Sequence, residues 1–426
     1  MKTRLIPCAL VAALVAIAGI RAQDVEAPSP SLLDLVMKTR AARLAGDNQG
    51  WLENGRETLK RTSGHPDLLI SVARALAANG RFDEALAHLE QAIERGAGFD
   101  LATFPEFKDA ADHAGLKSLA EQALANQQPI SPPEVFLAIA DTRIRPEGIT
   151  YDADGGRLFI GSLNGEIWQI DLQGQLNRFA GPDSSLREVL GMKVDPRRGL
   201  LWAVTGVFPD FFAPTGEPKK DVGLTGVLAF KLETGERVRD CWLDERPTLH
   251  GFNDLAIAKN GDVYVSDSTA NSVYRLPQGR CRFERLLQDV AMTFPNGIVL
   301  VPDESTLYVA HIEGLSAIDP QTGRRIQLAV PANAAVNSID GLAMDGADLL
   351  GIQPSPYVAR TVRIRLGEDG LSVGGATVIS SRPPLGLNQT TGVVVGSHFY
   401  TVAGFPDALV PGEVEKPSQV LRATLC

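Results

Sequence analysis

The chain has 426 residues, of which 44% are hydrophobic and 22% charged, and its formal net charge is −10 at pH 7. Because this length exceeds that of one ordinary domain, it predicts at least two folded units or a repeat architecture. The acidic balance argues against nucleic acid and anionic membrane surfaces as partners, since both carry negative charge themselves.

Residues 1–22 have the features of a secretory signal peptide. A basic start precedes an apolar run from Leu5 to Ile20, and Ala22 is a small residue of the kind found at cleavage sites. The run is shorter than a membrane-spanning helix and contains Pro7, which favours cleavage over anchoring. We therefore expect a periplasmic or extracellular protein that is free of the membrane after cleavage, with residues 23–30 as a linker.

Three cysteines follow this segment, namely Cys241, Cys281 and Cys426. In an oxidising compartment an odd number allows at most one bridge within the chain. Cys241 and Cys281 are the better-placed pair.

Residues 31–127 show apolar positions at helical spacing and are rich in Ala and Leu, which predicts a small all-α domain. The stretch 66–96 resembles one tetratricopeptide repeat, at Gly80, Phe82, Ala85 and Ala92. A single repeat cannot bury its own face, so the flanking segments are expected to supply packing partners. Two roles are open: a groove that docks a protein partner, or a helical cap that packs on the following domain.

A Pro-rich linker at residues 128–133 ends the helical pattern, and strand-like alternation follows it. Six similar segments recur at intervals close to the length of a four-stranded blade, which predicts a six-bladed β-propeller over residues 134–426. The segments are Glu147-Gly148-Ile149, Leu190-Gly191-Met192, Asn253-Asp254-Leu255, Asn296-Gly297-Ile298, Asp340-Gly341-Leu342 and Thr391-Gly392-Val393. Because the chain ends before a last strand, residues 134–140 are predicted to complete the sixth blade and close the ring.

The first residues of these six segments are expected to lie at one height around the central channel. Four of them are oxygen donors, namely Glu147, Asn253, Asn296 and Asp340. Two carboxylates with two amides and no Cys or His favour a hard divalent cation, calcium first, with magnesium or manganese as alternatives. The competing interpretation is that Asn and Asp simply favour the turn that enters a strand.

At these residues the sequence resembles the gluconolactonase and regucalcin family of calcium-dependent propeller lactonases. The resemblance implies that the four donors hold the metal and that Asp340 is also the general base. One position departs from the pattern: sugar lactonases of the family commonly place a substrate-contacting Arg two residues before the Asn of the Asn-Asp pair, where this chain has Gly251.

Further candidates surround the predicted channel mouth. His250 and His311 are candidate proton shuttles or substrate contacts, with surface or packing histidines as the alternative. Long loops at 208–220, 354–360 and 405–417 should overhang the metal. Their aromatic residues, which would set specificity or pack on one another, include Phe208, Phe212, Tyr357 and Phe405.

Two functions follow from these observations. The first is a secreted, calcium-dependent hydrolase of a lactone or related cyclic ester, in which the metal polarises the carbonyl and Asp340 accepts a proton from water. The second is a non-catalytic, calcium-stabilised propeller whose helical domain docks a protein partner.

Overall fold

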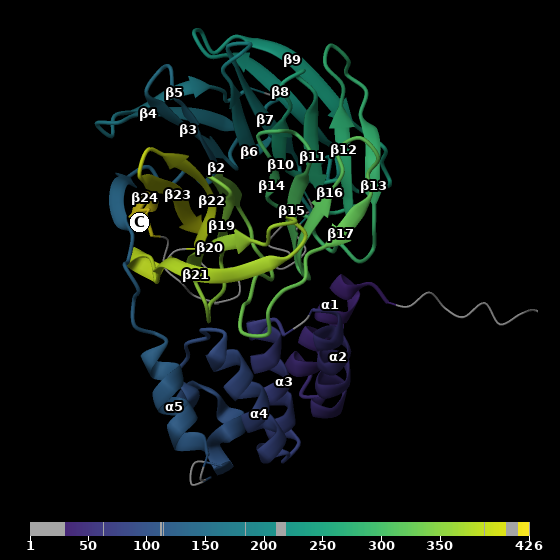
Figure 1. Cartoon of the computed structure of the whole chain (residues 1–426), viewed down its shortest axis with the longest axis vertical. Coiled ribbons are helices and arrows are strands. Elements are labelled where there is room, and N and C mark those ends of the chain that lie inside the picture. The colour runs from purple at the N-terminus through teal and green to yellow at the C-terminus, as the bar shows by residue number, and fades with distance from the viewer. Residues whose placement is uncertain are drawn as a thin grey trace, which may run out of the picture.

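The computed structural model describes residues 30–425 apart from residues 63, 111–112, 114, 184, 210–218, 387 and 406–415. The predicted signal peptide and Cys426 lie outside these residues. A helical domain sits beneath a ring of blades in Figure 1, next to β19, β20 and β21. None of the described helices is long and apolar enough to cross a membrane.

The helical domain contains five α-helices and two short 3-10 helices. They are α1 (Leu32–Leu44), α2 (Asn48–Arg61), α3 (Pro66–Ala78), α4 (Phe82–Glu94), η1 (Leu101–Thr103), η2 (Pro105–Ala110) and α5 (Leu116–Ala125). Ser31 and Asp34 form a capping box at the start of α1. Gly80 turns the chain between α3 and α4 with a φ of 73°, a left-handed conformation that suits glycine. Ala73, Ala85 and Ala92 are fully buried in one cluster, so the repeat-like helix pair is present.

Six four-stranded antiparallel sheets form the propeller, which confirms the predicted fold class. Blades 1 to 3 are β2 (Pro146–Asp152) to β5 (Leu176–Ala180), β6 (Glu188–Asp195) to β9 (Arg237–Leu243), and β10 (Phe252–Ile257) to β13 (Glu284–Gln288). Blades 4 and 5 are β14 (Ile298–Leu300) to β17 (Arg325–Gln327), and β18 (Leu342–Asp345) to β21 (Val373–Ser381). Between the bounds already given lie β3 (Arg157–Ser162), β4 (Glu166–Asp171), β7 (Leu200–Gly206), β8 (Thr225–Lys231), β11 (Val263–Asp267), β12 (Ser272–Leu276), β15 (Leu307–His311), β16 (Gly314–Ile318), β19 (Asp348–Gln353) and β20 (Arg360–Leu366).

The sixth blade joins the two ends of the propeller. It combines β22 (Asn388–Val395), β23 (His398–Phe405), β24 (Ser418–Thr424) and β1 (Glu134–Ile139). Strand β1 pairs antiparallel with β24, with Val135 opposite Leu421 and Ile139 opposite Ser418. The predicted closure of the ring by the segment before the first blade is therefore confirmed, with β1 as the outermost strand of the sixth blade.

The structure also contains the bridge favoured by the sequence, between Cys241 and Cys281. Cys241 belongs to β9 of blade 2, and Cys281 lies between β12 and β13 of blade 3. The bridge therefore fastens two neighbouring blades to each other near their outer edges.

The helical domain packs on blade 5 through a mixed polar and apolar contact. Val358 and Tyr357, from the loop between β19 and β20, belong to the same hydrophobic cluster as the helices. Arg360 is buried and donates to the carbonyl oxygen of Arg95 at 2.9 Å. In an antiparallel blade this loop lies at the end where the innermost strand begins, so the helices cover the face of blade 5 on which the channel residues enter.

Candidate functional site

Local irregularities in the innermost strands position the six channel residues. In blades 1, 2, 3 and 6 the pairing of the first and second strands shifts register across the channel residue, as between Phe252 and Leu255 in blade 3. Such bulges re-aim side chains that a regular strand would alternate between faces. In blades 4 and 5 the first strand begins only after the channel residue, at Ile298 and Leu342.

Glycines allow the innermost strands to approach one another. A Cβ atom at Gly148 would lie 1.9 Å from the Leu190 carbonyl oxygen, and one at Gly341 would lie 2.6 Å from the Thr390 carbonyl oxygen. The Gly341 N–H donates to that same oxygen at 2.7 Å. The glycine that follows most channel residues is therefore a requirement of close contact between blades, and this contact brings the six first residues together around one axis.

The two carboxylates of this ring influence each other. The pKa of Asp340 is raised to about 7: desolvation is the largest cause, a hydrogen bond from Asn296 opposes it, and the charge of Asp254 adds to it. Desolvation also raises the pKa of Glu147 well above its ordinary value, and the charge of Asp340 adds to this effect. Two carboxyl groups that disfavour each other's ionisation form a site where a cation would be strongly stabilised.

The amides complete the donor set. The Asn253 side chain donates from Nδ2 to Ser268 Oγ at 3.2 Å, which leaves its oxygen as the atom available to a ligand. Glu147 Oε2 and Asn296 Oδ1 are buried and have no hydrogen-bond partner. Unpaired buried oxygens are costly unless a ligand satisfies them, so these atoms fit a hard cation.

The other two ring positions carry no donor for an ion. Leu190 is buried, and the Thr391 hydroxyl donates to the main-chain oxygen of Glu147. Among the described residues, no group of three or more His, Cys, Asp or Glu is placed to hold a metal, since half of this donor set consists of amides.

Stability without a bound cation should depend on pH through Asp340. A carboxyl whose pKa is raised in the folded state contributes stability that is present at low pH, below about 4, and is lost as the pH rises towards about 7. In chelator, the wild type should lose on the order of 4 kcal/mol relative to Asp340→Asn over this range. Urea unfolding of both proteins between pH 4 and pH 8 measures the difference, and parallel curves would contradict the raised pKa.

Comparison with known proteins identifies the propeller. The SMP-30/gluconolactonase/LRE-like region matches residues 145–350, which contain the four donors of the ring. This part of the chain belongs to that family. The resemblance inferred from the channel residues is therefore confirmed, while no curated protein sequence matches the chain.

Several solved structures are similar to this chain at low identity. Regucalcin from Agrobacterium tumefaciens, described as a calcium-binding protein, is 14% identical, with a TM-score of 0.46 over 69% of this chain and 97% of that chain. A putative oxidoreductase (glucose dehydrogenase) from Thermus thermophilus is 16% identical, with a TM-score of 0.45 over 70% and 99%. An inactive virginiamycin B lyase from Staphylococcus aureus is 14% identical, with a TM-score of 0.44 over 70% and 100%.

In this gluconolactonase-like propeller both candidate histidines are buried and make two hydrogen bonds each. His250 bonds Asp267 at 2.6 Å and Glu245 at 3.2 Å. Burial lowers the pKa of His250, but the bonds and charges of Asp267 and Glu245 outweigh it and raise the pKa overall. His311 bonds Glu313 and Ser316, both at 2.8 Å. Both imidazole groups thus bond to protein side chains, and the structure does not bring them into the ring of donors.

The aromatic candidates lie in different places. Phe208 packs against Phe294 with ring centroids 6.0 Å apart, and a Cβ atom at Gly251 would lie 2.8 Å from the Phe208 ring. An Arg at position 251 would therefore have no room beside Phe208. Tyr357 instead packs edge-on against Phe99 of the helical domain, at 6.2 Å. Phe212 and the side chain of Phe405 lie outside the described residues.

Sequence analysis did not single out Phe294, although it stands two residues before Asn296. Its φ is 56°, a left-handed conformation that is uncommon for a bulky residue, and its N–H donates to Asn271 Oδ1 at 3.0 Å. Ser338 stands two residues before Asp340 and also has a positive φ, of 48°. Backbone conformations of this kind cannot be inferred from Phe or Ser in a sequence, since neither residue type favours them.

The helical domain reaches the neighbourhood of the ring through α3. His65 Nδ1 accepts from the Asp67 N–H, so the neutral ring carries its proton on Nε2 and donates to Ser338 Oγ at 2.8 Å. Burial lowers the pKa of His65, which favours this neutral form. Asn337 donates to the Thr62 carbonyl oxygen at 2.8 Å. The start of α3 is thus held two residues away from the ring carboxylate Asp340.

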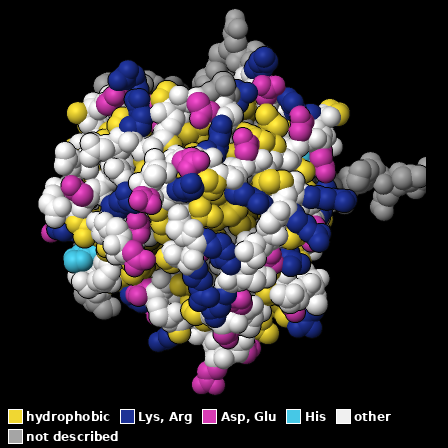
Figure 2. Space-filling view, turned by 90° about the horizontal axis from the view of Figure 1, so that it is seen from above, with side chains coloured by type: hydrophobic (Ala, Val, Ile, Leu, Met, Phe, Trp, Pro, Cys, Tyr) yellow, Lys and Arg dark blue, Asp and Glu magenta, His cyan; other side chains and the backbone are white. Residues whose placement is uncertain are grey.

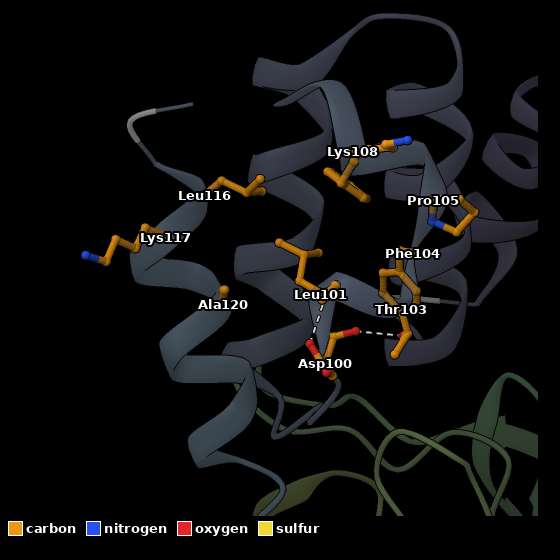
Figure 3. A pocket seen from close by; sticks show the side chains of 11 residues that line it. Asp100, Leu101, Thr103, Phe104, Pro105, Lys108, Leu116, Lys117 and Ala120 are labelled. Atoms are coloured by element: carbon orange, nitrogen blue, oxygen red, sulfur yellow. Dashed lines mark hydrogen bonds between the residues drawn. The ribbon is translucent and has the colours of Figure 1, made fainter. Parts of the chain in front are cut away.

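A separate cavity of about 640 Å³ lies within the helical domain, between η1, η2 and α5. Figure 3 shows Leu101 and Phe104 on its inner side, while the Lys117 side chain extends away from it. The cavity is formed by helices alone and has no lining residue from the propeller. Its lining residues come after the repeat-like stretch 66–96 in the chain.

Proposed function

We propose that the propeller is a calcium-dependent hydrolase of a lactone or a related cyclic ester. The observation that carries this proposal is the convergence of the Glu147 and Asp340 carboxyls with the amides of Asn253 and Asn296. Two oxygens of this set, Glu147 Oε2 and Asn296 Oδ1, are buried and unpaired. These donors match the oxygen ligands that calcium prefers, and no nitrogen or sulfur donor is among them. They lie in the part of the chain that belongs to the gluconolactonase family.

Glu147, Asn253, Asn296 and Asp340 would hold the cation. When bound, calcium supplies positive charge that polarises a substrate carbonyl oxygen and stabilises the charge that develops on it. Asp340 accepts the proton of the attacking water, and the hydrogen bond from Asn296 orients its carboxyl group. Phe208 and Phe294 form an apolar wall at the mouth, which excludes water from one side of the substrate.

The compartment is part of this proposal. The signal-like segment at residues 1–22 and the Cys241–Cys281 bridge both support a periplasmic or extracellular location. Lysine and arginine side chains are interspersed with acidic ones over the face shown in Figure 2. This mixed surface, with the net charge of −10, supports a small molecule rather than nucleic acid as the partner of the protein.

A second function is favoured by Gly251. The absence of an Arg, and of room for one, removes a substrate contact that sugar lactonases of the family commonly have. In this alternative the propeller is non-catalytic, calcium stabilises it, and the helical domain docks a protein partner.

Turnover of lactones with and without calcium separates the two functions. Proton release from aliphatic, sugar and aromatic lactones should be detectable with calcium and should fall to background in chelator. Readdition of calcium should restore it. If no lactone is hydrolysed while calcium still binds, the hydrolase proposal gives way to the binding propeller.

A further inference from the structure

A third carboxylate, that of Asp254, directly follows the ring residue Asn253 in the chain. The residue that follows the ring residue is glycine in five blades, namely Gly148, Gly191, Gly297, Gly341 and Gly392, and aspartate only in blade 3. Asp254 is 2% exposed, and its carboxylate accepts from the Leu255 N–H at 2.8 Å and from the Ile298 N–H of blade 4 at 3.4 Å. A Cβ atom at Gly191 would lie 2.4 Å from Asp254 Oδ1, so the glycine of blade 2 makes room for this carboxylate.

The negative charge of Asp254 disfavours ionisation of both ring carboxyls. Its charge contributes to the raised pKa values of Glu147 and Asp340 alike. The three carboxylates therefore repel one another electrostatically, and together they carry three negative charges when ionised.

A lysine of blade 2 lies beside this group. Lys193, in β6, places Nζ 3.5 Å from Asp254 Oδ1, and 29% of its side chain is exposed. It lines a cavity of about 330 Å³ inside the propeller, whose walls come from the innermost strands of all six blades. Among the described residues that line this cavity, Lys193 is the only charged one, and the others are mostly Ile, Val, Leu and Ala.

The charges of these groups balance for a divalent ion. A buried set of charges is costly unless it is neutralised within the site. Three carboxylates are neutralised by one divalent cation together with one ammonium group. A trivalent cation beside the same ammonium would leave one positive charge in excess.

We propose that the Lys193 ammonium supplies the third positive charge of the metal centre, beside the two charges of a divalent ion. This charge limits the affinity of the centre for cations and sets its preference for a divalent over a trivalent ion. This inference rests on the cation site of the proposed function. It makes Lys193 and Asp254 positioning residues that act through charge and does not require either of them to touch substrate.

The test is a double-mutant cycle on Lys193→Met and Asp254→Asn in the full chain, with calcium titrated by calorimetry and terbium by luminescence. Lys193→Met should tighten calcium binding about tenfold and terbium binding about thirtyfold, because the removed repulsion scales with the charge of the ion. Asp254→Asn should weaken both. The double variant should return to within about threefold of the wild type, since it restores the charge balance.

Two controls complete the experiment. Lys231→Met removes the same charge from an exposed position in blade 2, where Lys231 pairs with Glu236, and should leave both affinities unchanged. Lys193→Arg keeps the charge and should behave as the wild type, and thermal melting in chelator verifies that each variant is folded. If Lys193→Met leaves both affinities unchanged or weakens them, the inference is overturned and the proposed site stands. If the wild type binds neither ion, both are overturned.

Discussion

Asp340→Asn is expected to lower lactone hydrolysis by about 100-fold or more at saturating calcium, because asparagine keeps an oxygen for the cation but cannot accept a proton. In the structure Asp340 is the ring carboxyl that the hydrogen bond from Asn296 orients, which places it to accept a proton from a water molecule in the channel. Loss of one negative charge should weaken calcium binding only moderately. Saturating calcium therefore prevents lost affinity from resembling lost chemistry.

The matched control for this substitution is Leu190→Ala. Leu190 occupies the same ring in blade 2 and offers no donor, so its truncation changes the shape of the channel and leaves the charges in place. We expect a much smaller loss of turnover for this variant. An Asp340→Asn protein that retains most of the wild-type rate would remove Asp340 from the role of base.

Calcium is expected to stabilise the fold substantially, since the four donors come from four blades and meet only in the native state. At a free concentration about 100 times the dissociation constant, a ligand that binds only the folded chain adds about 2.7 kcal/mol to the free energy of unfolding. Melting with calcium and with chelator measures the shift. The double variant Asn253→Ala with Asn296→Ala should melt at nearly the same temperature in both conditions.

The expected stabilisation by calcium has a structural reason. Without a cation, Glu147 Oε2 and Asn296 Oδ1 are buried and unpaired, and the two ring carboxyls raise each other's energy on ionisation. A bound cation relieves both costs. If calcium shifts the wild type and the double variant equally, the ion binds elsewhere.

The propeller could be predicted because its determinants repeat along the chain. Each blade opens with a channel residue followed by Gly or Asp. The structure shows that in blades 1, 2, 4 and 5 this glycine meets the main chain of the next blade, as Gly148 meets Leu190. The closing strand β1 could also be predicted, since a ring with five complete blades and one incomplete blade leaves a single unfilled position. Both inferences depend on local sequence and on closure, which apply whatever the details of packing.

What could not be predicted depends on contacts between distant segments. The Lys193–Asp254 pair joins the neighbouring blades 2 and 3, and Lys193 is not part of any repeated segment. The placement of Tyr357 could not be predicted from the sequence either. Its loop was expected to overhang the metal, but its ring packs against Phe99 because the helical domain covers that face of blade 5.

The helical domain is an integral part of the channel face. Arg360 and Asn337 donate to main-chain oxygens of the helical domain, and His65 binds Ser338 beside the ring. Single-sequence reasoning left open whether these helices cap the propeller or dock a partner. The observed contacts make them a cap on blade 5, and they leave the cavity between η1, η2 and α5 on the helical side of this contact.

Titration calorimetry of the metal-free protein with calcium tests the central claim most directly. We predict one calcium ion per chain for the wild type and for Leu190→Ala. For Glu147→Ala, which removes a charged donor with an unpaired oxygen, we predict an affinity at least tenfold weaker. No calcium binding by the wild type, or binding that Glu147→Ala leaves unchanged, would contradict a metal centre in the channel.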